Sequence, residues 1–246
     1  MARHVIVALE YPRRGLIRAS DMDRRSQPSA RRRSSVFARL VSLALLMAVA
    51  GSASAQSTEF WPEVDVYWRP AEHQRTFLEL SSSAERDGPK REATVGLYQD
   101  YLRLPIGYLR AGYRFTFSTR DASYRESRIV GEGVVTCYSS DVARLLNRTR
   151  GELRWVNGAY SYRIRDRLHL QRVPPKDSRF GLAPYGTFEV YYDSREAQIS
   201  RLAGRVGSEK RLSGRASIDV YIARQNNLHS TPSYVNALGI TAKLEY

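Results

Sequence analysis

The chain has one cysteine, few lysines and no long apolar run. Cys137 has no partner for an internal disulfide, and only four of the 39 basic residues are lysines. Arginine is favoured where a cation pairs with carboxylates in a fixed, forked geometry. The longest apolar run, 40–50, is too short for a transmembrane helix, which needs about 20 residues. Helical periodicity is almost absent as well. The sequence therefore argues against both a helical membrane protein and a soluble helical protein.

The N-terminal part reads as a targeting segment. A basic stretch ends at Arg39, "LVSLALLMAVA" follows at 40–50, and the small residues "GSASA" occupy 51–55. This order is typical of a secretory signal peptide, with cleavage expected after Ala55. We therefore predict an N-terminal extension and signal peptide over 1–55 and one mature domain over 56–246.

The basic charge does not indicate nucleic-acid binding. The formal net charge is +14, and half of it lies in the first 55 residues. A basic surface is the usual footprint of phosphate binding, but an exported domain does not meet nucleic acid. We expect no nucleic-acid partner.

Alternation with a period of two dominates the mature chain. In "YLRAGYRFTFS" (108–118), Leu109, Tyr113 and Phe115 fall on one face, and Arg110 and Arg114 fall on the other. Such alternation predicts β-strands with one apolar face. The eleven candidate strands are 61–68, 75–82, 93–103, 108–118, 127–138, 144–155, 160–171, 184–193, 199–208, 214–225 and 234–246. Asp166 is the one breach of the apolar face in its strand.

Two architectures fit this pattern: a soluble β-sandwich and an up-and-down transmembrane β-barrel. In the barrel the apolar faces meet lipid and the polar faces line the lumen. The barrel is favoured by the arginine-rich polar faces, by alternating short and longer connections, and by aromatic residues at strand ends that predict interfacial girdles. Those residues are Trp61, Trp68, Tyr101, Tyr108, Trp155, Tyr160, Tyr192, Tyr234 and Tyr246. Because single-chain bacterial barrels have even strand numbers, we expect about twelve antiparallel strands, with ten as the alternative.

The mature chain resembles the bacterial outer-membrane β-barrel family called domain of unknown function 2490. The resemblance covers nearly all of 59–246, in "FWPEVDVYW" (60–68), "LRAGYRF" (109–115), "RTRGELRW" (148–155), "YSYRIRDRL" (160–168), "GTFEVYYD" (186–193), "GRASIDVYIA" (214–223) and "ALGITAKLEY" (237–246). It implies a location in the outer membrane of a Gram-negative bacterium. It also implies that Ile240, Leu244 and Tyr246, on one face of the last strand, form the signal read by the barrel-insertion machinery. It implies no activity, and the weakly apolar 199–208 and the long connection 173–181 depart from the expected pattern.

The polar faces predict an interior lined by arginines and carboxylates. The predicted inward residues include Glu63, Asp65, Glu79, Arg110, Arg114, Arg148, Arg150, Glu152, Arg154, Arg163, Arg165, Glu189, Arg201, Arg205, Arg215 and Asp219. If these charges hold one another, the barrel is mainly structural or porin-like. If they leave an aqueous path, the surplus arginine predicts a narrow anion-preferring channel.

Catalytic and cofactor signatures are weak. A lipid-modifying barrel enzyme would need a serine beside an oriented histidine, and the mature chain offers His73, His169 and His229, the last followed by Ser230. We expect no enzyme activity, no metal and no cofactor. The polar loops around 82–92, 118–127 and 225–233 predict contacts with outer-membrane lipids and lipopolysaccharide phosphates, for which arginine is suited.

Overall fold

The computed structural model describes residues 57–246 except 87, 89, 121–122, 176–177 and 179–180. Within that part of the chain the fold is all-β, and no helix there is long and apolar enough to cross a membrane. The strands are β1 (Thr58–Ala71), β2 (Gln74–Glu85), β3 (Arg91–Tyr101), β4 (Gly107–Ser118), β5 (Arg125–Ser139), β6 (Ala143–Val156), β7 (Ala159–Arg172), β8 (Leu182–Asp193), β9 (Gln198–Arg211), β10 (Ala216–Asn227) and β11 (Tyr234–Glu245). The predicted signal peptide and its cleavage after Ala55 lie outside the described residues.

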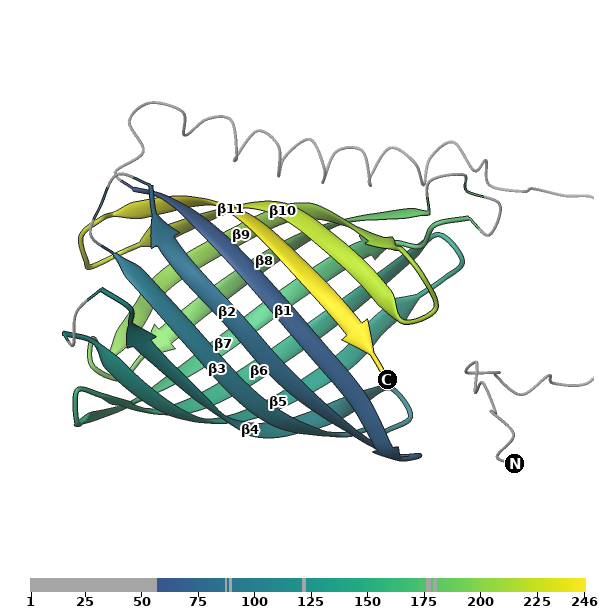
Figure 1. Ribbon diagram of the computed structural model, residues 1–246, viewed down its shortest axis with the longest axis horizontal. Helices are drawn as coiled ribbons and strands as arrows, with labels where there is room; N and C mark the ends of the chain where they lie inside the picture. Colours follow the sequence, from purple (N-terminus) through teal and green to yellow (C-terminus); the bar gives the residue numbers. More distant parts are fainter. Residues whose placement is uncertain (1–56, 87, 89, 121–122, 176–177, 179–180) are drawn as a thin grey trace, which may run out of the picture. The chain divides into compact units, whose positions relative to one another are not determined.

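The strands form a closed barrel in which each strand pairs with its neighbours in sequence. All sequential pairs are antiparallel, but β1 and β11 close the barrel side by side in the same direction (Figure 1). The barrel therefore has eleven strands, one fewer than the twelve we expected, and the alternative of ten is wrong as well. A parallel seam satisfies the backbone groups of both end strands, so closure does not require an even number.

The seam also fixes where the chain ends lie. The first end of the barrel carries the start of β1 and the connections 86–90, 119–124, 157–158, 194–197 and 228–233. The second end carries Tyr246 and the connections 72–73, 102–106, 140–142, 173–181 and 212–215. The expected alternation of short and longer connections is wrong. Strands such as β2 and β5 extend into segments predicted as loops, which shortens the connections at the first end. The longest of these connections, 173–181, lies at the second end.

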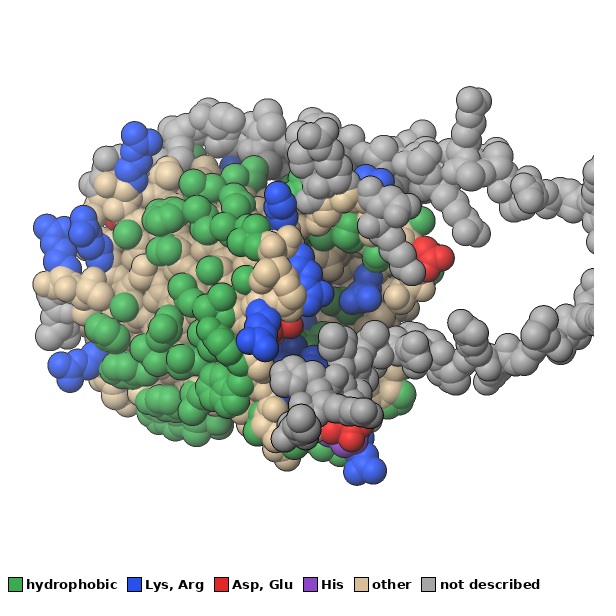
Figure 2. Space-filling model, turned by 45° about the vertical axis from the view of Figure 1, so that its right-hand side comes forward, with side chains coloured by type: hydrophobic (Ala, Val, Ile, Leu, Met, Phe, Trp, Pro, Cys, Tyr) green, Lys and Arg blue, Asp and Glu red, His purple; other side chains and the backbone are tan. Residues whose placement is uncertain are grey.

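Alternation along each strand separates apolar from charged side chains. Leu97 is 53 % exposed on the outside of β3, whereas its neighbour Tyr98 is 1 % exposed inside. The same contrast holds for Ile222 at 53 % and Tyr221 at 4 % on β10. Figure 2 shows hydrophobic side chains over much of the visible outer wall. The barrel is thus apolar outside and charged inside, the inverse of a water-soluble domain.

The aromatic residues are divided between the outer wall and the interior. Trp155 and Tyr160 pack against each other on the outer wall at the first end, with ring centroids 5.6 Å apart. Tyr101 and Tyr246 are exposed at the second end. Trp61 was predicted to lie in the girdle but points inward and packs on the interior cluster of Tyr185, Tyr221, Ala223 and Ala237. Tyr108, also predicted in the girdle, lies inside beneath the guanidinium groups of Arg75 and Arg110.

Inward glycines make room for inward tyrosines. Tyr98 lies across Gly112 on the neighbouring β4, where an added Cβ would stand 2.4 Å from Tyr98 Cδ1. Tyr221 lies across Gly239 on β11 in the same way, with an added Cβ 2.0 Å from its Cζ. Large rings can therefore lie flat against the barrel wall, which leaves the centre of the barrel to the charged side chains.

Candidate functional site: the charged interior of the barrel

The barrel interior is densely charged. The buried charged residues are Glu59, Asp65, Glu79, Asp100, Arg110, Glu126, Glu132, Arg150, Glu152, Arg154, Arg163, Arg165, Glu189, Asp193 and Asp219. A charge removed from water is tolerated only when it is paired and hydrogen-bonded. The pairing of these groups therefore decides what the interior can do.

One buried carboxylate organises the β2–β5 wall near the second end. Asp100, fully buried, accepts hydrogen bonds from Arg75 Nε at 2.8 Å and from Arg110 Nε at 2.6 Å. Arg110 also stacks over Phe77, 4.5 Å from the ring centroid, and its Nη1 lies 3.8 Å from Glu132 Oε1. Arg110 thus links the Asp100 group to the next carboxylate along the wall.

The chain of ion pairs continues from β5 to β8 without a break. Arg150 lies 2.6 Å from Glu132 and 3.7 Å from Glu152. Arg165 then lies 3.0 Å from both Glu152 and Glu189. Together with Asp100 and Arg110, these groups form a connected network on six neighbouring strands, β3 to β8.

Glu189 is the most highly connected carboxylate of this network. It pairs with Arg165 at 3.0 Å, Arg167 at 2.8 Å and Arg148 at 3.4 Å, and it accepts a hydrogen bond of 2.8 Å from the Tyr191 hydroxyl. Its 2 % exposure leaves almost no access to water. Three guanidinium groups therefore share this buried carboxylate. Arg165 also pairs with Glu152, and Arg148 lies 3.6 Å from Glu132, whereas Arg167 has no other carboxylate partner in the described part of the chain.

A second group of charges lies towards the first end. Asp193 pairs with Arg154 at 2.7 Å and with Arg163 at 2.8 Å. Glu126 pairs with the same Arg154 and with Arg128. Each carboxylate here has at least two arginine partners, so the β5–β8 wall is held by shared charges rather than by isolated pairs.

Two arginines of β9 do not join this network. Arg201 lies over Tyr191, 5.4 Å from the ring centroid, and Arg205 lies 4.9 Å from Tyr221 and 5.8 Å from Trp61. Neither forms an ion pair with any residue in the described part of the chain. Both guanidinium groups keep unused donors that face the interior.

Two carboxylates in the same quarter of the barrel also lack arginine partners. Asp65 accepts a hydrogen bond of 3.2 Å from Tyr67, and Asp219 accepts one of 2.8 Å from Tyr185. The Oδ1 atoms of both are buried and have no hydrogen-bond partner among the described groups. On the β9–β1 side Arg201, Arg205, Asp65 and Asp219 therefore form no ion pairs with one another, although Lys243 pairs with Glu209 there. The β3–β8 side is held by direct pairing.

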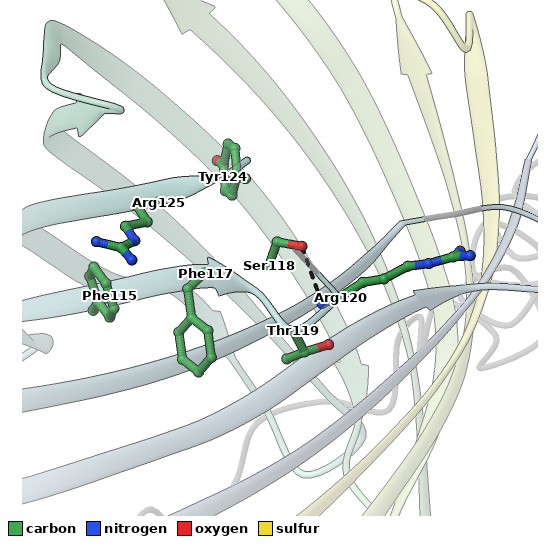
Figure 3. Close-up of a pocket in the computed structure, with 7 residues that line it drawn as sticks. All are labelled: Phe115, Phe117, Ser118, Thr119, Arg120, Tyr124 and Arg125. Atoms are coloured by element: carbon green, nitrogen blue, oxygen red, sulfur yellow. Dashed lines mark hydrogen bonds between the residues drawn. The ribbon is translucent and has the colours of Figure 1, made fainter. Parts of the chain in front are cut away.

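An open groove lies at the first end, beside the β4–β5 connection (Figure 3). It has a volume of about 430 Å³ and is lined by Phe115, Phe117, Ser118, Thr119, Arg120, Tyr124 and Arg125. The Tyr124 hydroxyl donates to Glu126. Burial and the Glu126 carboxylate raise the pKa of Tyr124 to about 12, so its hydroxyl remains a donor at neutral pH. Aromatic rings and cations thus meet at the rim.

The structure brings together most of the residues predicted for the lumen. Arg110, Arg114, Arg148, Arg150, Glu152, Arg154, Arg163, Arg165 and Glu189 form interior ion pairs. Arg201, Arg205 and Asp219 point inward but form no ion pair with the described residues. Lys243, also inside, pairs with Glu209 at 2.6 Å. Arg215 is the exception, because it lies exposed in the 212–215 connection. The outward face of β11 carries Ile240 and Leu244, and Tyr246 follows at 71 % exposure.

Several network carboxylates were missed from the sequence. Glu126 and Glu132 have the same parity on β5, but Val130 and Val134 lie between and beyond them on the inward face. Apolar residues on both faces blur the amphipathic signal of this strand. Every second residue counted from Glu132 points inward, so this spacing identifies Glu126 as an interior carboxylate once the charged interior is known.

The three histidines in the described part of the chain are not brought together. His73 is exposed in the 72–73 turn at the second end, and His229 is exposed in the 228–233 connection at the first. His169 lies inside β7, stacked on Tyr185 with centroids 4.9 Å apart. Among the described residues no group of histidine, cysteine and carboxylate side chains has the arrangement of a metal site.

The fold and its interior define a closed eleven-stranded β-barrel with an apolar outer wall and a salt-bridged core. No protein-family model matches the chain, and no curated protein matches it. Membership of the family called domain of unknown function 2490 therefore stays a prediction from the sequence.

Proposed function

We propose that this protein is a bacterial outer-membrane β-barrel, exported through a cleavable signal peptide, whose salt-bridged interior makes it mainly a structural or porin-like component. The observation that carries the proposal is the inverted distribution of side chains. Leu97, Leu109 and Ile222 are at least half exposed outside, while Glu152 and Glu189 are almost fully buried inside. Lipid is the solvent in which such an outer wall is favourable.

The ends of the barrel suit the two membrane interfaces. Tyr160 and Trp155 at the first end and Tyr101 at the second lie on the outer wall, where their amphipathic rings would sit at headgroup level. The groove beside Arg120 and Arg125 combines rings with cations and fits lipid phosphates or lipopolysaccharide. The outward face of β11 would serve the barrel-insertion machinery.

The proposal is tested by comparing boiled and unboiled membrane fractions on a denaturing gel. We expect the protein in the outer-membrane fraction, with a faster-migrating folded form that disappears on boiling. A protein recovered only from the soluble periplasm, with the same mobility before and after heating, contradicts the proposal.

A narrow anion-preferring channel is the second candidate, favoured by the unpaired Arg201 and Arg205. Cationic side chains without partners raise the local concentration of anions in a pore. A unit charge at 4 Å contributes about 1 kcal/mol in water, or roughly fivefold in local anion concentration. The paired arginines on the opposite wall add less, because their carboxylates cancel the field.

The channel candidate predicts an effect of these two arginines on ion selectivity. In planar bilayers with a potassium chloride gradient, we expect the wild type to conduct with a preference for chloride. The double variant Arg201→Gln, Arg205→Gln should lose most of that preference, whereas Arg215→Gln, at an exposed rim position, should keep it. Closed traces in the wild type, or an unchanged reversal potential in the double variant, exclude this candidate.

A lipid-modifying enzyme has no comparable support. Its histidines would need a serine and an orienting group within hydrogen-bond reach. His73 and His229 lie at opposite ends of the barrel, and His169 is stacked inside it. We therefore propose no catalytic role.

A further inference from the structure

One carboxylate lies on the apolar outer wall, in the middle of β7. Asp166 has the same parity as Ile164 and Leu168, which are 47 % and 46 % exposed, and it is exposed as well. It lies well inside both ends of β7, far from either rim. An ionisable group at this depth on a lipid-facing wall is costly, and it marks a functional contact by default.

Asp166 is held by two polar neighbours of β6. Thr149, its direct cross-strand partner, donates from Oγ1 to Asp166 Oδ2 at 2.6 Å. Asn147 donates from Nδ2 to Asp166 Oδ1 at 2.9 Å. We call Asn147, Thr149 and Asp166 the outer polar trio. The trio orients the carboxylate but does not cover it.

Three glycines leave the wall beside the trio without side chains. Gly131 pairs with Gly151, and Gly133 pairs with Thr149, so three outward glycines adjoin the trio on β5 and β6. An added Cβ at Gly131 or Gly151 would meet no atom within 4 Å, and one at Gly133 would meet only Leu109 at 3.8 Å. Packing within the barrel therefore does not require glycine here. Glycine inside a strand often marks the close approach of another backbone.

We propose that the outer polar trio and its glycines are the contact site for a second copy of this chain in the membrane, a proposal that rests on the membrane location proposed above. A two-fold axis along the membrane normal brings each residue against residues at its own depth, so the trio meets the partner's trio.

The trio is chemically self-complementary. Each Asn147 amide has a second N–H, and each Asp166 carboxylate retains lone pairs after its two hydrogen bonds. In a symmetric pair, Asn147 of each copy donates to Asp166 of the other. Lipid chains offer no donor, and lipid phosphates lie at the membrane surface, so neither satisfies this carboxylate.

Cross-linking in native membranes tests the geometry. In a Cys137→Ser background, Gly151→Cys places a thiol beside the trio, and Leu238→Cys places one on the opposite wall, on β11. Copper phenanthroline should convert Gly151→Cys into a disulfide-linked dimer and leave Leu238→Cys a monomer. Equal cross-linking of both variants, or of neither, overturns the proposal.

Solution mass tests the chemistry. In dodecyl maltoside, light scattering should give the mass of two chains for the wild type and for Asp166→Asn, whose amide oxygen still accepts from Asn147 and whose NH2 can donate to the Thr149 hydroxyl. Asp166→Leu should give one chain, and Gln99→Leu, an outward polar residue bonded to Thr76 on another part of the wall, should remain a dimer. A monomeric wild type, a dimeric Asp166→Leu, or a trio covered by a different protein in membranes contradicts the inference.

The two proposals fail in different ways. If the protein is absent from the outer membrane, the proposed function fails and the inference fails with it. If it is a heat-modifiable outer-membrane protein that stays monomeric, the inference alone is wrong.

Discussion

Replacing Glu189 with glutamine is expected to lower the free energy of unfolding by about 3–5 kcal/mol, the range seen when one partner of a buried ion pair is removed. Arg148, Arg165 and Arg167 all lie within 3.4 Å of this carboxylate, which is 2 % exposed. Glutamine conserves the volume but leaves these cations without their shared counter-charge. The shift is measured by urea unfolding in lipid vesicles, followed by tryptophan fluorescence.

The matched control is Glu72→Gln, in the exposed turn between β1 and β2. Exposed ion pairs contribute about 0–1 kcal/mol, so this variant should unfold at the midpoint of the wild type. If Glu189→Gln also keeps that midpoint, the interior is hydrated enough to solvate its arginines. The channel candidate would then gain support over the structural one.

Gly112→Val is expected to destabilise the barrel by about 3 kcal/mol, at the upper end of ordinary overpacking effects. A Cβ at this position would lie 2.4 Å from Tyr98 Cδ1 and 2.5 Å from the backbone oxygen of Leu97. The ring could rotate away, but the backbone oxygen belongs to the paired β3 strand. The expected readout is a lower temperature at which the folded gel band disappears.

Two further variants make this expectation specific. Gly186→Val changes an outward glycine whose added Cβ would come no closer than 3.9 Å to any atom, so its folded band should persist as in the wild type. Adding Tyr98→Ala to Gly112→Val should restore only part of the lost thermal stability, because the clash with Leu97 remains. Equal heat sensitivity of Gly112→Val and Gly186→Val would show that the tyrosine–glycine contact does not limit stability.

These interior contacts explain how a barrel of this size is filled. The network on β3 to β8 fixes one wall through shared carboxylates such as Glu152. The opposite wall uses Tyr221 lying over Gly239 and leaves Arg205 without a carboxylate. The two walls therefore differ: direct ion pairs hold the first, whereas Arg205 on the second is packed on aromatic rings.

The sequence predicted the strands because side-chain alternation is a local property. Leu109, Tyr113 and Phe115 on one parity and Arg110 and Arg114 on the other follow from the pleat of a single strand. The eleven candidate segments correspond to the eleven observed strands. The expected even number was wrong because it assumes an antiparallel seam, whereas β1 and β11 pair in parallel.

The sequence by itself determined which face of each strand is charged and which is apolar. Only the tertiary structure decided the parallel seam of β1 and β11 and the partners of each arginine, whereas the inward position of Trp61 already followed from its parity with Glu63 and Asp65. The seam joins the two ends of the barrel sequence, and the ion pairs depend on the register between neighbouring strands. A two-residue shift would change these ion pairs without changing the alternation. Closure of the barrel selects one register. In that register three arginines pair with Glu189, whereas Arg205 has no carboxylate partner among the described residues.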